Sequence, residues 1–232
     1  MINNAVQPEV IMQCRGISKT FETRRGPIQI LKDVSFNVRR GQITVISGRT
    51  GTGKSTLLGL LGGLDKPSTG EIWLDDQRID NLSTARWSSI RRKKISILFQ
   101  NFNLLPSWTA GENVEATMLH TGINRQQRNE KISALLAEFG LRERMEHLPC
   151  ELSIGQQQMV ALARAIVNEP AILLADEPSD DVDPQTAQEL VNRLVLLGRN
   201  GTTIIVATHG NFPLDVADRC FLLEDGRIKA CG

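Results

Sequence analysis

Eight residues in the first quarter of the chain have the composition and spacing of a loop that binds phosphate. Residues 48–55 read GRTGTGKS, which fits the pattern G-x-x-x-x-G-K-[ST] between an apolar, β-branched segment and a segment with helical character. The glycines let the backbone fold round an anion with its N–H groups directed inward. Lys54 adds a positive charge, and the hydroxyl group of Ser55 can ligate Mg²⁺. The pattern predicts a nucleotide site and leaves the reaction open.

Three further groups of polar residues each come directly after a short apolar segment. They are Gln100, the pair Asp176 and Glu177, and His209. Because open parallel sheets bind ligands at the carboxyl ends of their strands, we expect these side chains to converge on the phosphate-binding loop. Asp176 is then expected near Mg²⁺ beside Ser55, and Glu177 is the candidate that polarises the attacking water. His209 is expected at the γ-phosphate, and Gln100 at the metal or the water.

Each of these residues also has a purely structural interpretation. An Asp-Glu-Pro sequence can end a strand in a turn, and a histidine at the end of a strand is often structural. Gln100 by itself would indicate nothing. Their combination with the phosphate-binding loop favours the catalytic interpretation.

The elements that position these residues alternate along the chain. Apolar segments at residues 43–46, 95–99, 171–175 and 202–208 predict buried strands, and residues 152–167 and 185–197 predict helices. Strand, helix and strand in succession imply parallel pairing. Residues 10–38 alternate as half-buried antiparallel strands, residues 221–228 form an Asp-Gly hairpin, and residues 108–148 have a helical pattern. The predicted fold class is α/β: a P-loop NTPase core with a mainly parallel sheet, an antiparallel β subdomain and an inserted α-helical subdomain.

The composition excludes several classes of protein. The 232 residues include 27 basic and 26 acidic side chains, a net charge of +1, which provides no broad basic surface for nucleic acid. The four cysteines have no metal-binding spacing and are expected as free thiols in a reducing compartment. No leader pattern or membrane-spanning apolar segment is present, so we expect a cytoplasmic protein. The basic segment at residues 75–95 predicts a solvated face, with anionic lipid or a partner as the alternative.

Taken in order, these motifs resemble those of the ATP-binding cassette (ABC) transporter ATPases over nearly the whole chain. The matching motifs are Walker A (residues 48–55), the Q-loop (Gln100), the signature (residues 152–156), Walker B (residues 172–176, followed by Glu177), the D-loop (residues 179–183) and the switch histidine (His209). The resemblance implies one ABC ATPase domain over residues 1–232. Its antiparallel β subdomain would comprise residues 9–46, 70–74 and 220–230, and its helical subdomain residues 106–152.

The resemblance also implies the cofactors ATP and Mg²⁺ and a role for each motif residue. Lys54, Gln100, Glu177 and His209 would be catalytic, and Ser55, Gln100 and Asp176 would hold the metal. Phe21 would stack on adenine, with packing in the core as the alternative. The residues expected to bind nucleotide are Phe21, Gly48, Arg49, Thr50, Gly51, Thr52, Gly53, Lys54, Ser55, Thr56, Ser153, Gly155 and Gln156.

Partners follow from the same resemblance. Residues 61–67, 99–106 and 112–114 are similar to the lipoprotein-release and macrolide-export branch, whose members drive membrane permeases and are described as transmitting mechanical force. Ser153 and Gly155 would contact the γ-phosphate of ATP on a second copy, which implies a homodimer or a pair with a related cassette. The apolar loop at residues 102–105 would contact the permease, or else pack inside the helical subdomain. We expect a peripheral protein on the cytoplasmic face of a membrane, without nucleic acid.

Four residues depart from the family pattern: Ile154 replaces a glycine, Met159 an arginine, Asp180 a small residue and Gly210 an aspartate. Our hypothesis is that hydrolysis survives while dimer closure is slowed or depends on a partner. The alternative function is a non-transport nucleotide-dependent regulator with reduced ATPase activity. A soluble ABC protein of DNA repair or translation usually needs two cassettes or a long coiled coil, which this chain lacks. A GTPase is disfavoured because no N-K-x-D motif is present.

Overall fold

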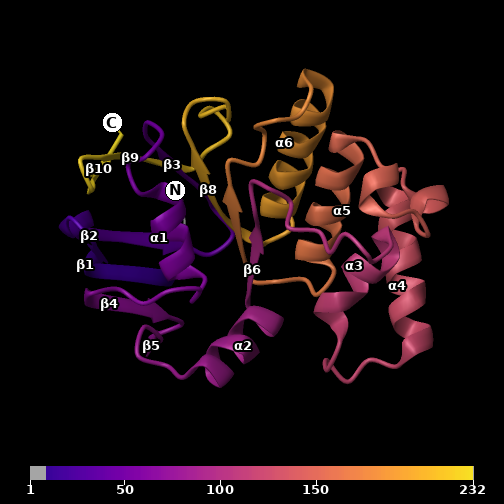
Figure 1. Cartoon of the computed structure of the whole chain (residues 1–232), viewed down its shortest axis with the longest axis horizontal. Helices are drawn as coiled ribbons and strands as arrows, with labels where there is room; N and C mark the ends of the chain where they lie inside the picture. The colour runs from indigo at the N-terminus through magenta and orange to yellow at the C-terminus, as the bar shows by residue number, and fades with distance from the viewer. Residues whose placement is uncertain (1–8, 232) are drawn as a thin grey trace, which may run out of the picture.

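Two β-sheets form the frame of the molecule in the computed structural model, which describes residues 9–231 (Figure 1). The larger sheet has the strand order β10-β9-β3-β8-β7-β6, and the smaller sheet has the order β2-β1-β4-β5. The larger sheet comprises β3 (Ile43–Ser47), β6 (Ile95–Leu98), β7 (Ile172–Asp176), β8 (Thr203–Thr208), β9 (Arg219–Glu224) and β10 (Arg227–Ala230). The smaller comprises β1 (Val10–Thr23), β2 (Gly26–Arg39), β4 (Thr69–Leu74) and β5 (Gln77–Arg78).

Helices cover the larger sheet and extend the molecule away from it. They are α1 (Lys54–Leu61), α2 (Thr84–Lys93), α3 (Ala110–Glu115), α4 (Arg125–Glu138), α5 (Ile154–Ile166) and α6 (Pro184–Arg199). In Figure 1, α5 and α6 lie on one side of the larger sheet, whereas α1 and the smaller sheet lie on the other. None of the helices in residues 9–231 is long and apolar enough to cross a membrane.

The alternation of side chains along the parallel strands divides the core into two layers. On β7, Leu173 and Ala175 pack in the apolar cluster that contains α5 and α6. Ile172 and Leu174 point to the opposite face and pack in the cluster that contains α1 and the smaller sheet. Because both faces are covered, the parallel strands are apolar throughout, as their sequences predict.

Side-chain caps fix where several helices begin. Ser153 caps α5: its hydroxyl group accepts a hydrogen bond from the Gln156 N–H group, and the Gln156 side chain accepts one from the Ser153 N–H group. Asp183 caps α6 by accepting from the N–H groups of Gln185 and Thr186. The predicted start of a helix near Ser153 is therefore confirmed.

The segment from residue 108 to residue 148 is helical and free of strands, as its pattern predicts. It contains α3, α4 and two short 3-10 turns, Ala116–Met118 and Arg142–Arg144. Helix α2 was not predicted, since the basic segment around it has little apolar periodicity. Its one buried residue, Trp87, lies against Gly63, where an added Cβ would approach the indole ring to 2.1 Å. Arg91 on the same helix donates hydrogen bonds to the carbonyl oxygens of Gly62 and Gly63, so these two side chains hold α2 against the end of α1.

The C-terminal strands correct one prediction. Residues 220–230 were assigned to the antiparallel subdomain, but β9 pairs in parallel with β3 and belongs to the larger sheet. Only the β9–β10 hairpin is antiparallel. The Asp-Gly turn indicates that local pairing correctly, and the side chains of Phe221 and Leu223 are buried in the apolar cluster with α1 and the smaller sheet. Strand β3, at residues 43–47, likewise lies outside the antiparallel sheet.

Candidate nucleotide-binding site

The phosphate-binding loop lies between β3 and α1 and is closely fitted by its neighbours. A Cβ at Gly48 would lie 2.4 Å from the carbonyl oxygen of Leu223, and a Cβ at Gly53 would lie 2.8 Å from Cγ2 of Ile30. Gly53 also has the left-handed backbone (φ 102°) that starts α1. The glycines are therefore required by close approach on two sides, by β9 and by β2.

Lys54 points back into the loop. Its Nζ atom donates to the carbonyl oxygens of Gly48 at 2.8 Å and Arg49 at 3.2 Å. The same atom lies 3.1 Å from Oε1 of Glu177, and both side chains are buried. The charge of Lys54 is thus held at the mouth of the loop, where a phosphate would bind.

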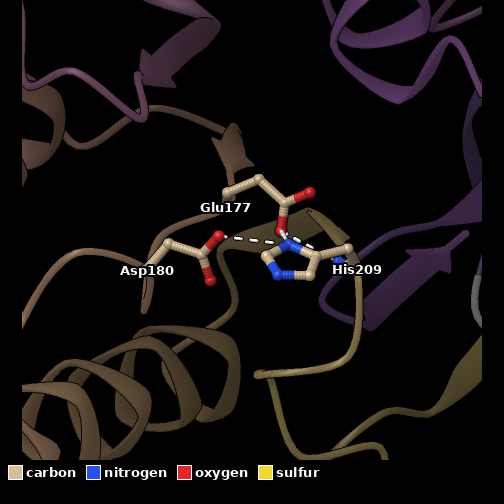
Figure 2. A group of neighbouring side chains, drawn as sticks. All are labelled: Glu177, Asp180 and His209. Atoms are coloured by element: carbon tan, nitrogen blue, oxygen red, sulfur yellow. Dashed lines mark hydrogen bonds and ion pairs between the residues drawn. The ribbon is translucent and has the colours of Figure 1, made fainter. Parts of the chain in front are cut away.

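Glu177 lies between Lys54 and His209. Its Oε2 atom accepts a hydrogen bond from the backbone N–H group of His209 at 2.9 Å and lies 3.1 Å from His209 Nδ1. Asp180 also lies beside this ring, with its Oδ2 atom 3.1 Å from Nδ1 (Figure 2). Two carboxylates therefore contact one imidazole nitrogen.

Asp176 carries the features expected of a metal ligand. Burial raises the pKa of its carboxyl group, with the charges of Glu177 and Asp180 acting in the same direction, although the Ser55 hydroxyl group and Lys54 oppose the rise. Its Oδ1 atom is buried and has no hydrogen-bond partner among the described residues. A hard cation would satisfy this oxygen, and a carboxylate beside a hydroxyl group fits the oxygen ligands that Mg²⁺ prefers.

These side chains meet in a cleft of about 270 Å³ at the carboxyl ends of the parallel strands. Of the predicted catalytic residues, Lys54, Gln100, Glu177 and His209 all line it. The lining also includes Thr50, Gly51, Gly53, Ser55 and Thr56 of the loop and its helix. Asp180 lines the cleft too, although the sequence indicates it only as a departure from the family pattern.

The other predicted contacts lie outside this cleft. Ser153, Gly155 and Gln156 are at the start of α5, and the side chains of Ser153 and Gln156 cap that helix. Phe21 lies on β1 with 39% of its surface exposed, so the core-packing alternative is wrong. The Lys19 ammonium group lies 4.8 Å from the centre of the Phe21 ring. An exposed aromatic face near the end of β1, beside a cation, is compatible with the predicted contact to adenine.

The apolar loop at residues 102–105 fits both interpretations in part: some of its residues pack against the core, and one is exposed to a possible partner. Phe102 and Leu104 are partly buried and pack against the core, whereas Leu105 is 41% exposed. Arg164 donates hydrogen bonds to the carbonyl oxygens of Phe102 and Asn103, which hold the loop against α5. The loop is therefore anchored and only partly available to a partner.

Comparison with known proteins identifies the class. Residues 31–180 match the ABC transporter family. The uncharacterised ABC transporter ATP-binding protein YknY of Bacillus subtilis (strain 168) is 36% identical over 218 residues, which cover 94% of this chain and 95% of that protein. The macrolide export ATP-binding/permease protein MacB of Vibrio parahaemolyticus is 36% identical over 222 residues, 96% of this chain and 34% of that protein.

A solved structure has the same fold. The dimeric, post-hydrolysis structure of the ATP-binding cassette MJ0796 bound to ADP and Pi superposes with a TM-score of 0.87 at 35% identity, covering 94% of this chain and 97% of that one. The chain belongs to the ABC transporter family. Membership confirms the predicted family and fold class, and with them the prediction of an ATP-hydrolysing transporter subunit that uses ATP and Mg²⁺.

Proposed function

We propose that this chain powers a membrane permease by closing, as a pair of copies, on two ATP molecules and hydrolysing them. The observation that supports this most strongly is the convergence of Lys54, Glu177 and His209 in one cleft beside Asp176. These residues come from three separate strand ends, and no structural need of the fold requires all of them to be polar and mutually bonded.

Each residue has a role that its position supports. Lys54 and the loop N–H groups would hold the β- and γ-phosphates, while Ser55 and Asp176 would hold Mg²⁺ with Gln100 near it. The ion would supply charge neutralisation on the phosphates. Glu177 would accept a hydrogen bond from the attacking water and so orient it. His209 would donate to the γ-phosphate and keep it in line.

The signature residues support a shared site. Ser153 and Gly155 lie at the start of α5, outside this chain's own cleft, so they would reach ATP on a second copy. Ile154 is the first residue of α5 and has no left-handed backbone, so its side chain introduces no strain there. That side chain is 55% exposed and would face the partner. The solved structures of the relative MJ0796 are dimeric.

A groove between the core and the helical segment would receive the permease. It has a volume of about 270 Å³ and is lined by Leu64, Arg91, Phe99 and Arg164, among others. Burial lowers the pKa of Arg164. An apolar groove flanked by two guanidinium groups fits a short amphipathic helix with acidic residues. The relative MacB, an ATP-binding/permease protein by name, supports a permease partner, and we place the chain on the cytoplasmic face of the membrane as a peripheral export or mechanotransmission subunit.

ATP turnover and gentle co-purification test this proposal. The purified chain is assayed for hydrolysis of Mg-ATP in parallel with the variants Glu177→Gln and Lys54→Ala. In a separate experiment, membranes from cells that express the tagged chain are solubilised in mild detergent. We expect the wild type to hydrolyse ATP and the two variants not to hydrolyse it. We also expect an integral membrane permease to be recovered with the tagged chain. No turnover by the chain together with its recovered permease would reject the ATPase role. Turnover without a permease would favour the alternative, a nucleotide-dependent regulator outside transport.

A further inference from the structure

The side chain of Asp180 is fixed beside His209 by several contacts. Its side chain is 8% exposed, and its Oδ2 atom lies 3.1 Å from His209 Nδ1. The other carboxylate oxygen accepts a hydrogen bond from Asn211 Nδ2 at 3.1 Å, and the Asp180 N–H group donates to the Glu177 carbonyl oxygen at 3.1 Å. The carboxylate is therefore fixed in place by contacts on both sides.

Figure 2 shows that the two carboxylates approach the same ring nitrogen from different directions. Glu177 is already engaged by Lys54 and by the His209 backbone as well as by Nδ1. For hydrolysis, Lys54 must turn to the phosphates and Glu177 to the attacking water. Asp180 has no such second task, so it can retain Nδ1 while Glu177 leaves it.

We propose that Asp180 is a positioning residue for His209: it accepts the Nδ1–H hydrogen bond, and so it keeps a proton on Nδ1 and fixes the direction of the ring during the reaction. This inference rests on the proposed function. A carboxylate on one ring nitrogen orients an imidazole and determines which nitrogen carries the proton. With Nδ1–H committed to Asp180, Nε2 faces the phosphate, and it donates to a phosphate oxygen when the ring carries protons on both nitrogens.

Turnover kinetics provide the first test. Because an orienting partner of a histidine is worth about ten- to hundredfold in activity, we expect Asp180→Ala to lower kcat about tenfold, with KM for ATP changed less than about twofold. Asp180→Asn, whose amide oxygen can still accept from Nδ1–H, is expected to recover most of kcat. The matched control is Asp76→Asn, since Asp76 is exposed, lies outside the motifs and has a left-handed backbone (φ 59°) that asparagine tolerates.

A double-mutant cycle separates positioning from a general effect on the fold. In a His209→Ala background, Asp180→Ala is expected to have no further effect on kcat. The inference is wrong if Asp180→Ala equals the wild type, or if it lowers kcat by the same factor with and without His209. A wild type with no turnover above Glu177→Gln would instead count against the proposed function, so the two failures are distinguishable.

Nitrogen NMR tests the same bond without relying on turnover. The chain has three histidines, so ¹⁵N-histidine signals of His209 can be assigned by comparison with His209→Ala. In Glu177→Ala, where Asp180 is the remaining carboxylate, we expect Nδ1 to stay protonated. In Glu177→Ala/Asp180→Ala we expect the proton to be on Nε2. Identical spectra of these two variants, each shown to be folded by circular dichroism, would overturn the inference.

Discussion

The Nζ atom of Lys54 lies 3.1 Å from Oε1 of Glu177, with 5% of the lysine side chain and 8% of the glutamate side chain exposed. This pair joins the residue expected to bind phosphate to the residue expected to orient water. Each needs a different partner once ATP is present. ATP binding must therefore separate two buried charges that neutralise each other, and part of the phosphate-binding free energy is used in doing so.

Replacing Glu177 by glutamine is expected to strengthen ATP binding. Lys54 is then free of its competing carboxylate, and one negative charge is removed beside the phosphates. Without nucleotide, the variant is expected to melt at a lower temperature, because the buried ammonium group loses its counter-charge. Calorimetric titration with Mg-ATP and thermal melts measure both effects, and Glu143→Gln, at an exposed site, is the control. Weaker ATP binding by Glu177→Gln would contradict this account.

The ionised carboxylate of Asp176 is expected to destabilise the folded protein in the absence of Mg²⁺. Because burial raises the pKa of its carboxyl group above the ordinary 3.8, folding favours the protonated form, and the ionised form at neutral pH is destabilising. Asp176→Asn should therefore raise the Tm at pH 7.5. The difference from the wild type should shrink as the pH falls toward 3.8.

Thermal melts of Asp176→Asn and the wild type, with and without Mg-ATP, test the expected direction of the change in Tm. Mg-ATP should raise the Tm of the wild type more than that of the variant, since the variant has lost a carboxylate ligand. A variant that is less stable than the wild type at pH 7.5 without nucleotide would refute the assigned direction.

Phe21 is expected to contribute to adenine binding. Stacking of a base on an aromatic ring is worth about 1–3 kcal/mol, so Phe21→Ala should raise the Kd for ATP roughly five- to hundredfold. Phe21→Trp should retain affinity, because it keeps the aromatic face. Leu214→Ala, at a residue that is also about half exposed, is the control. Equal loss of affinity for ATP and for inorganic triphosphate would argue against a contact with the base.

Ile154 is expected to weaken closure of the dimer. A branched apolar side chain, 55% exposed, stands where the resemblance places a glycine against the partner's ATP. In the Glu177→Gln background, Ile154→Gly should therefore increase the fraction of ATP-dependent dimer. Analytical ultracentrifugation over a range of protein concentrations measures that fraction. A lower dimer fraction would mean that Ile154 contributes a favourable contact.

The catalytic cleft could be predicted because its residues follow strands with clear apolar patterns. Gln100, Asp176, Glu177 and His209 stand at strand ends, and parallel pairing brings such ends to one edge of the sheet. The place of Asp180 could not be predicted in this way. Glu177 has a left-handed backbone (φ 45°) and so does Asp181 (φ 59°), and these conformations of non-glycine residues fold the segment back over His209.

The pairing between strands that are distant in the sequence also could not be predicted. The Asp-Gly turn identifies the hairpin of β9 and β10 from local residues alone. That β9 lies beside β3 depends on which apolar faces remain to be covered after the rest of the chain has folded, and neither strand's own sequence encodes it. Helix α2 was missed because Trp87 is its one buried residue, and a single buried side chain leaves no periodic apolar pattern.

The central position of β3 also determines when the protein can begin to work. Its two neighbours, β8 and β9, begin at residues 203 and 219, although β3 itself ends at residue 47. During synthesis, the strand that carries the phosphate-binding loop has neither neighbour until nearly the whole chain has left the ribosome. We therefore expect polypeptides that end before β8 to lack the sheet that holds this loop in place.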